Sequence, residues 1–248
     1  MLAIFAHPDD EAFGPGGTLA KYAKGGVEVH LLCVTRGEAG QINEKVKNDL
    51  RIKHDENKEE IKIGELREKE LLNSAKILGI KKVEFLDYID GRLCNAIYHE
   101  LAKKISRKIN DFKPQVVLTA ENHGVSGHLD HIAVSMITTY AYLKTEITGK
   151  LYYHCLPQKL YDERMQNYFI YFPEGYKESE ITTRIDYSSV WQKKVAAMKA
   201  HQSQSKDAET LIARFEKWPK IDNFILKYSR GIKVKLPEKD FFEGIKEK

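Results

Sequence analysis

Apolar runs and helical spacings alternate along the first half of the chain. Short apolar runs predict strands at residues 2–6, 27–35, 81–88 and 115–120. Apolar positions at helical spacing predict helices at residues 16–26, 66–78, 96–112 and 130–143. Strands that alternate with helices form βαβ units. We therefore expect an α/β fold with a mainly parallel sheet and helices on both of its faces.

After Gly149 the pattern becomes shorter and mixed. Apolar runs predict strands at residues 150–156, 168–172 and 181–187, and helical spacing predicts a helix at residues 190–201. The chain has no internal repeat and no low-complexity linker. We expect a single domain over residues 1–248, with a smaller mixed C-terminal part and a C-terminal extension from about residue 205 to 248.

One segment in the first half is unusually rich in charge. Residues 42–65 read INEKVKNDLRIKHDENKEEIKIGE, with isoleucines scattered among the charges. The pattern favours a solvated helical insertion. The segment also follows the carboxyl end of a predicted strand, which is the edge of an α/β sheet where ligands bind. A lid over a ligand is therefore the alternative.

Composition excludes several classes of function. The 40 Lys and Arg are mixed with 36 Asp and Glu along all 248 residues, so no basic stripe for nucleic acid forms. No apolar run approaches the roughly 20 residues of a membrane span, and charges appear too early for a signal peptide. The cysteines are few and far apart, which predicts reduced core residues: Cys33, Cys94 and Cys155. We expect a cytoplasmic protein.

Two polar clusters follow predicted strands. HPDDEAFG, residues 7–14, follows the first strand, and GHLDH, residues 127–131, follows the fourth strand and opens a helix. His128 and His131 are three residues apart, which places both rings on one side of a helix start. Histidines and carboxylates that meet at one sheet edge suit a catalytic zinc, with three protein ligands and one position for water. A divalent cation also lets adjacent carboxylates stay ionised.

Helix capping is the simpler interpretation of the same acids. Asp9 and Asp10 could cap the helix that begins near Gly16, and Asp130 could cap its own helix. Capping does not explain why two clusters of histidine and aspartate occur at the same edge of the predicted sheet. We therefore favour the metal site.

Six motifs along the chain carry a family resemblance. They are AHPDDE, GGT, TRGEAG, FLDYIDG, GHLDH and HQSQ, in that order from about Ala3 to Gln204. In order and spacing they resemble the LmbE-like, or PIG-L, family of N-acetylglucosamine deacetylases. The resemblance implies a Rossmann-like fold, a mononuclear zinc site and removal of acetyl groups from N-acetylglucosaminyl conjugates. It implies a small-molecule partner, and it leaves ferrous iron in the cell and a homo-oligomer as open alternatives.

The resemblance also implies a role for individual residues. His7, Asp10 and His131 become the metal ligands, and Asp9 becomes the general base. His128 becomes a charged group that stabilises the oxyanion and, as an alternative to Asp9, protonates the leaving amine.

Three further residues receive supporting roles from the same resemblance. Asp130 becomes the carboxylate that orients His128, and Arg67 and Asp90 become contacts to the sugar. The chain departs from some members at Ser126, where they have a tyrosine that contacts the acetyl oxyanion. The segment before Arg67 is also longer than usual. These departures leave the group attached to the sugar open: inositol, malate, a lipid or a second sugar.

Rival functions share the donor set. Two histidines and one carboxylate also form the facial triad of iron oxygenases, but those sites sit on β-barrels and this pattern predicts none. A catalytically silent metal- or sugar-binding homologue would have no need of Asp9, which a metal alone does not require. A structural zinc domain does not fit an open site without cysteines.

Overall fold

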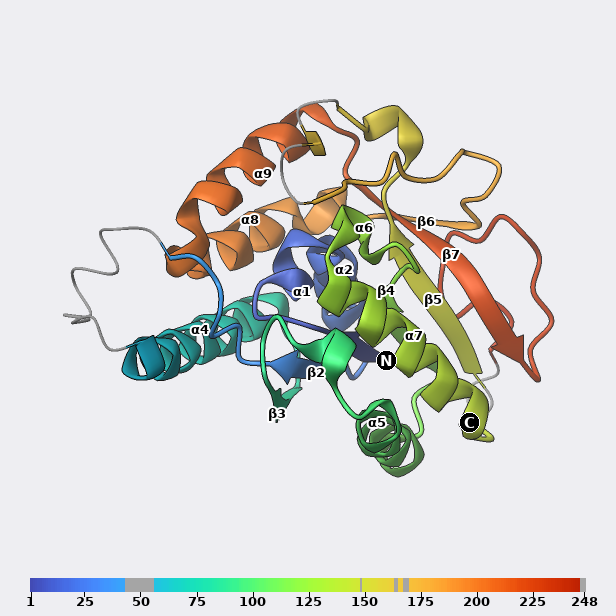
Figure 1. The fold of residues 1–248 in the computed structure, drawn as a ribbon. Coiled ribbons are helices and arrows are strands. Elements are labelled where there is room, and N and C mark those ends of the chain that lie inside the picture. The colour runs from blue at the N-terminus through green and yellow to red at the C-terminus, as the bar shows by residue number, and fades with distance from the viewer. Residues whose placement is uncertain (43–55, 148, 163–164, 167–169, 246–248) are drawn as a thin grey trace. The chain divides into compact units, whose positions relative to one another are not determined.

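The computed structural model describes residues 1–42, 56–147, 149–162, 165–166 and 170–245 (Figure 1). The strands are β1 (Leu2–Phe5), β2 (His30–Thr35), β3 (Lys82–Tyr88), β4 (Val116–Ala120), β5 (Gly149–Cys155), β6 (Thr183–Asp186) and β7 (Ile221–Arg230). The α-helices are α1 (Asp10–Phe13), α2 (Gly16–Lys24), α4 (Glu56–Leu78), α5 (Tyr98–Phe112), α6 (Gly124–Gly127), α7 (Leu129–Lys144), α8 (Trp191–Ala200) and α9 (Ser205–Lys217). Short 3-10 turns are η1 (Leu93–Asn95), η2 (Gln158–Leu160), η4 (Ser188–Val190) and η5 (Gln202–Gln204).

The strands form a sheet of mostly parallel pairs, in the order β3-β2-β1-β4-β5-β7-β6. β2 pairs with β3, β1 with β4 and β4 with β5, all in parallel. β7 runs antiparallel to both β5 and β6. The predicted α/β fold with a mainly parallel sheet is therefore confirmed. The described residues fall into two compact units.

The first unit comprises Met1–Phe5, Leu93–Asp186 and Ile221–Lys248. Its strands β1 and β4 are buried along their whole length, as the continuous apolar runs predicted. The register places Leu2 beside Val117. α7 packs against β1, β4, β5 and α5, and Figure 1 shows α7 running across β4 and β5. No helix in the described ranges is long and apolar enough to cross a membrane.

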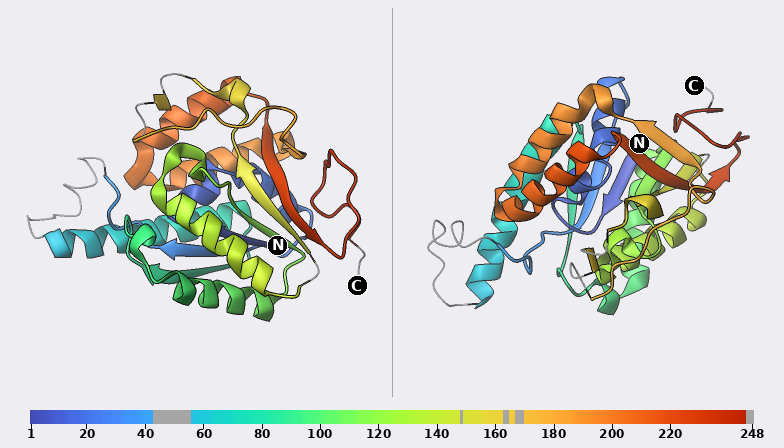
Figure 2. Two further views of the ribbon diagram at one scale, coloured as in Figure 1. Left: turned by 45° about the vertical axis from the view of Figure 1, so that its right-hand side comes forward. Right: turned by 90° about the horizontal axis from the view of Figure 1, so that it is seen from above.

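The second unit comprises Ala6–Arg92 and Tyr187–Lys220. α4 packs along α8 and α2, and both views of Figure 2 show α4 and α8 side by side. Apolar residues on the packed faces, such as Leu71 and Met198, are fully buried. The GGT motif has a packing role here, because a Cβ on Gly17 would lie 2.2 Å from the Tyr187 ring. Only glycine lets the second half of this unit approach α2 so closely.

Several elements differ from the sequence prediction, among them α9, which lies where only a mixed tail was expected. α4 begins at Glu56, ten residues before the helix predicted from residue 66, so residues 56–65 are helical, as the favoured interpretation of the insertion predicted. Residues 43–55 of that insertion lie outside the described residues, and the lid stays a prediction. Of the predicted strand 168–172, residues 170–172 form no strand and the others lie outside the described residues. β-propensity produces a strand only where a neighbouring strand accepts its hydrogen bonds.

The C-terminal tail contributes a strand that the sequence analysis did not predict. β7 pairs with β5 on one side and with β6 on the other, so part of the expected extension 205–248 belongs to the sheet. Its apolar run NFIL is too short to distinguish a strand from a helix by periodicity. The pairing partners decided its conformation.

Candidate active site

The turn after β1 is closed by Asp10. Its Oδ2 accepts hydrogen bonds from the peptide N–H groups of Ala6, at 3.1 Å, and His7, at 2.9 Å. Neither Asp9 nor Asp10 caps α2, whose N-cap is Pro15 without a side-chain bond. The capping interpretation of these two acids is therefore wrong. Asp10 instead folds the main chain back on itself and fixes the direction of its own carboxylate.

Asp9 occupies a strained conformation beside a buried guanidinium. Its φ is 119°, a region that L-residues rarely adopt. Arg67, only 4% exposed, donates from Nη2 to Asp9 Oδ2 at 2.8 Å and to the Pro8 carbonyl at 2.7 Å. Burial raises the pKa of Asp9 to about 6, although the Arg67 charge lowers it. Asp9 is therefore a carboxylate held in one direction with a proton affinity above the ordinary value.

The TRGEAG motif accommodates this guanidinium. Arg67 Nη1 donates to the Gly37 carbonyl at 2.7 Å. A Cβ on Gly37 would lie 2.5 Å from Nη1, and a Cβ on Gly40 would lie 2.2 Å from it. The two glycines thus make room for Arg67. Both terminal nitrogens have protein partners, and the predicted sugar contact of Arg67 stays a prediction.

Asp90 is a partner of His7. Its Oδ1 lies 2.8 Å from His7 Nε2, and its Oδ2 accepts from the Ala39 peptide N–H at 3.1 Å. Both side chains are buried. Although burial opposes ionisation, the hydrogen bond and charge of His7 lower the pKa of Asp90 below its ordinary value. A carboxylate on one ring nitrogen fixes the tautomer and leaves the other nitrogen to bind a metal. The sugar contact predicted for Asp90 is untested.

In the first unit, a buried glutamate shapes the loop between β4 and α7. Glu121, 2% exposed, accepts from the peptide N–H groups of His123 at 2.7 Å and Val125 at 2.6 Å. Val125 has a φ of 62°, which is strained for a β-branched residue. Tyr176 donates its hydroxyl to Glu121 at 2.5 Å. Glu121 and Tyr176 were missed by the sequence analysis, because neither belongs to a motif.

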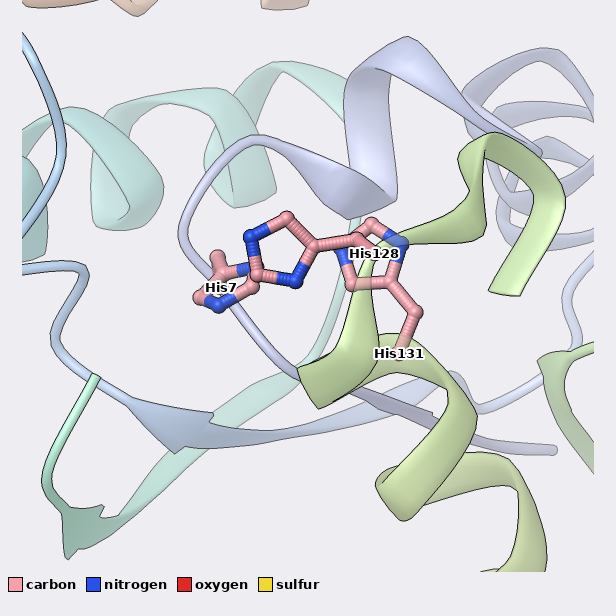
Figure 3. Close-up of side chains that lie close together, drawn as sticks. All are labelled: His7, His128 and His131. Carbon is pink, nitrogen blue, oxygen red and sulfur yellow. The ribbon is translucent and has the colours of Figure 1, made fainter. Parts of the chain in front are cut away.

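His128 and His131 lie at the start of α7. Their rings stack with centroids 4.8 Å apart and an angle of 25° between the planes. Figure 3 draws these two residues and also His7, which belongs to the turn after β1. His131 Nδ1 lies 3.0 Å from the Gly124 carbonyl. Because a carbonyl only accepts, Nδ1 carries the proton and Nε2 keeps its lone pair for a metal.

The N-cap of α7 is His128. Its Nδ1 accepts from the Asp130 peptide N–H at 3.2 Å, so the alternative interpretation, in which Asp130 caps this helix, is wrong. The Asp130 carboxylate accepts instead from the Leu93 peptide N–H at 3.0 Å. Because Nδ1 accepts in this contact, the ring proton of His128 is on Nε2. The orienting carboxylate predicted at Asp130 stays a prediction.

The predicted site residues are therefore divided between the units. The second unit holds five of them in two hydrogen-bonded groups, one of His7 with Asp10 and Asp90 and one of Asp9 with Arg67. The first unit holds the other three at the start of α7: His128, Asp130 and His131. Ser126 is half-buried in α6, next to Gly127.

Known proteins match this chain along most of its length. The family model PIG-L, GlcNAc-PI de-N-acetylase, matches residues 2–142. A mycothiol S-conjugate amidase from Streptomyces coelicolor is 28% identical over 301 aligned positions, with 100% of this chain and 97% of that protein covered. A 1D-myo-inositol 2-acetamido-2-deoxy-alpha-D-glucopyranoside deacetylase from Thermobifida fusca is 30% identical over 250 positions, with 86% of each covered.

Two solved structures share the fold. The 4-carboxy-2-hydroxymuconate hydratase from Pseudomonas putida has a TM-score of 0.68 at 20% identity, with 94% of this chain and 98% of that chain covered. The N,N'-diacetylchitobiose deacetylase from Pyrococcus horikoshii has a TM-score of 0.61 at 21% identity, with 90% and 81% covered. At these identities the likeness establishes the fold, which hosts both an amide hydrolase and a hydratase.

Proposed function

This chain belongs to the PIG-L family, GlcNAc-PI de-N-acetylase, and from that premise we propose that it is a metal-dependent hydrolase that removes the acetyl group from an N-acetylglucosaminyl conjugate. The observation that carries the proposal is the different environment of two adjacent carboxylates. Asp10 is held by peptide N–H groups, whereas Asp9 is held by the Arg67 guanidinium. One carboxylate can therefore bind a metal while its neighbour moves a proton.

Strand pairing supports a common location for the two clusters. β1 and β4 are parallel neighbours in the first unit, so their carboxyl ends lie at the same edge. The chain reaches His7 two residues after β1 ends, and the loop that leads to His128 begins directly after β4. Among the described residues, two donor sets have a composition that suits one ion: His7 with His128 and His131, and His7 with Asp90 and Asp130.

We assign the metal to His7, Asp10 and His131, following the family pattern. The carbonyl partner of His131 Nδ1 and the Asp90 carboxylate at His7 Nε2 support this role, because such partners fix the tautomer and orientation of a metal-binding imidazole. Zinc suits two nitrogens and a carboxylate, and ferrous iron accepts the same set. When bound, such an ion lowers the pKa of a water molecule and polarises the substrate carbonyl.

Asp9 is the general base in this proposal. Arg67 holds Oδ2, so Oδ1 is the oxygen that takes the proton of the attacking water. The C–N bond of the tetrahedral adduct then breaks, and the amine leaves with a proton. Asp9 can return the proton it took, which balances the reaction without a second acid.

His128 stabilises the developing oxyanion in this proposal. With Nδ1 accepting from the Asp130 peptide, Nε2–H is the donor that it can offer. This corresponds to a neutral donor, whereas the charged His128 expected from the family resemblance would require the Nδ1 contact to break. Asp9 is therefore the preferred source of the amine proton.

The proposal includes a class of substrate and a cellular compartment. The conjugate is a small molecule with an acetamido sugar, and we place the reaction in the cytoplasm. The three cysteines form no disulfide, which is consistent with a reducing compartment.

The test is a panel of acetamido sugars linked to inositol, malate, phosphatidylinositol or a second sugar. We expect one class to release amine and acetate in equal amounts, with the Asp9→Asn protein as the inactive control. A parallel assay offers 4-carboxy-2-hydroxymuconate, and its hydration without acetate release from any conjugate would favour the chemistry of the Pseudomonas putida hydratase. Failure of every conjugate to release acetate would overturn the proposal.

A further inference from the structure

A buried carboxylate next to the proposed base has no role in the mechanism above. Glu11, 1% exposed, lies in α1, two residues after Asp9. Its Oε2 accepts from the Asp9 peptide N–H at 3.1 Å. Its Oε1 lies 2.8 Å from His201 Nε2 and also accepts from the Ser74 hydroxyl. One carboxylate thus joins the main chain of Asp9 to two distant side chains.

The contact to Asp9 is made where the main chain is strained. Asp9 has φ 119° and ψ −28°, a conformation that is unfavourable for a residue with a Cβ and persists only where the surroundings hold it. Its carbonyl accepts from Ala12 and Phe13, and its side chain is held by Arg67. The other main-chain polar group of Asp9, its peptide N–H, donates a hydrogen bond to Glu11. The direction of the Asp9 carboxylate therefore depends on both Arg67 and Glu11.

His201 is placed for this contact. It is fully buried, and its Nδ1 has no partner among the described residues. A buried polar nitrogen without a partner lowers stability. Among the described residues, the hydrogen bond of the other ring nitrogen to Glu11 is therefore the contact that compensates for burying this ring. Phe13 meets the ring edge-on, with centroids 5.8 Å apart.

The rest of the HQSQ motif attaches this histidine to α4. Ser203 donates from its peptide N–H at 2.7 Å and from its hydroxyl at 2.6 Å to the buried Glu70. Arg67, Glu70 and Ser74 are spaced at three and four residues, so they share one face of α4. That face therefore holds the Asp9 side chain, the HQSQ segment and Glu11 together.

We propose that Glu11, His201 and Ser74 are positioning residues that hold Asp9 in its strained conformation and so aim its carboxylate. This inference rests on the proposed function, in which Asp9 is the base. The three residues act through the Asp9 peptide and contact no substrate. Their loss therefore changes kcat and leaves KM and metal content unchanged.

The experiment compares His201→Ala and His201→Gln with wild type. We expect His201→Ala to lower kcat about 10- to 100-fold, the range for a misplaced catalytic group. His201→Gln keeps an N–H donor and should recover part of that loss. The second readout is the amide signal of Asp9 in the full chain by NMR. Its hydrogen exchange should accelerate in His201→Ala and return toward wild type in His201→Gln.

A matched control comes from the first unit. Lys150 and Glu238 form a buried pair between a nitrogen base and a glutamate that are distant along the chain, as His201 and Glu11 do, with Nζ and Oε1 2.5 Å apart. Glu238→Gln should lower stability while leaving kcat and the Asp9 amide unchanged. If His201→Ala does not fold, Ser74→Ala replaces it, because it removes only a hydroxyl from α4, and the same two changes are expected at smaller size.

The outcomes separate this inference from the proposed function. If Asp9→Asn keeps full activity, the base assignment fails, whatever His201 does. If Asp9→Asn is inactive but the His201 and Ser74 variants keep wild-type kcat and Asp9 exchange, the positioning role is overturned. If no conjugate is hydrolysed, the amide measurement still decides whether these residues hold Asp9.

Discussion

The two units use different sets of contacts to hold a strained main-chain residue in place. Each has a buried glutamate, Glu11 or Glu121, that holds a strained main-chain residue next to proposed site residues. Glu121 accepts from peptide groups two and four residues further along the chain and from one distant hydroxyl, that of Tyr176, 55 residues away. Glu11 also accepts from the Asp9 peptide locally, but its other partners are 63 and 190 residues away. Most contacts of Glu121 therefore lie within its own loop, whereas most contacts of Glu11 join distant segments of the chain.

This difference leads to a general expectation. A change in the contacts of Glu121 should act mainly on the stability of the loop between β4 and α7. A change in the contacts of Glu11 should alter the conformation of Asp9, although the partners of Glu11 on α4 and in the HQSQ segment are distant along the chain. The following predictions test this contrast.

The largest effect is expected at Asp9 itself. Asp9→Asn keeps the shape of the side chain but cannot take a proton, so kcat should fall about 10²- to 10⁴-fold. Because Asp10, not Asp9, is assigned to the metal, metal content should stay at the wild-type value. Acetate release and elemental analysis of the same sample measure both quantities. Loss of metal together with activity would move Asp9 to the ligand set.

The next largest effect is a difference between variants of the two stacked histidines of the first unit. His131→Ala should empty the metal site, because its Nε2 is the assigned donor. His128→Ala should keep the metal and lower kcat about 100-fold, as for the loss of one oxyanion donor. Elemental analysis of both purified variants distinguishes them. Equal occupancy in the two proteins would contradict the assignment.

Changes in the contacts of Glu121 should have a smaller effect, which appears in the free energy of unfolding. Glu121→Gln replaces one of the two acceptor oxygens with an amide NH2 group, which leaves at least one buried peptide N–H without its acceptor. The free energy of unfolding should therefore fall by about 1–3 kcal/mol. Tyr176→Phe removes one of the three bonds and should cost about 1 kcal/mol. Urea unfolding measures both. A Glu121→Gln protein as stable as wild type would show that the loop holds its strained Val125 without this carboxylate.

The smallest effect is a pH dependence of stability that His201 should contribute. Burial lowers the pKa of His201, but the charge and hydrogen bond of Glu11 outweigh it and raise the pKa above its ordinary value. Asp9 and Glu70 also face the ring and act in the same direction. A raised folded-state pKa contributes stability that is complete below about pH 6.5 and is lost as pH rises through the folded value.

The measurement for this prediction is urea unfolding from pH 6.5 upward. Wild type should lose stability over this range, and His201→Gln, which cannot titrate there, should lack that component. Carboxyl groups with ordinary pKa values do not titrate above pH 6.5, and Asp9, whose pKa is about 6, is present in both proteins and contributes to both curves. Parallel curves for the two proteins would show that folding does not raise the pKa of His201.

Much of the fold was predictable because its signals are local. The four buried parallel strands appear as apolar runs, and the helices between them appear as helical spacings. The start of α4 was misplaced because residues 56–65, ENKEEIKIGE, are mostly charged and carry apolar residues only at Ile61 and Ile63, too few for a helical period. β7 was missed because its short apolar run becomes a strand only between β5 and β6.

The sequence by itself determined where the parallel strands lie along the chain and where the histidine and aspartate clusters follow β1 and β4, because periodicity and chain order carry that information. Only the tertiary structure decided which atom each side chain binds. Asp130 does not cap α7, because His128 takes that position, and Arg67 is committed to Asp9 and two carbonyls. His201 meets Glu11 across 190 residues. The choice of a hydrogen-bond partner depends on which groups the folded chain brings within about 3 Å, and residue spacing does not contain that distance.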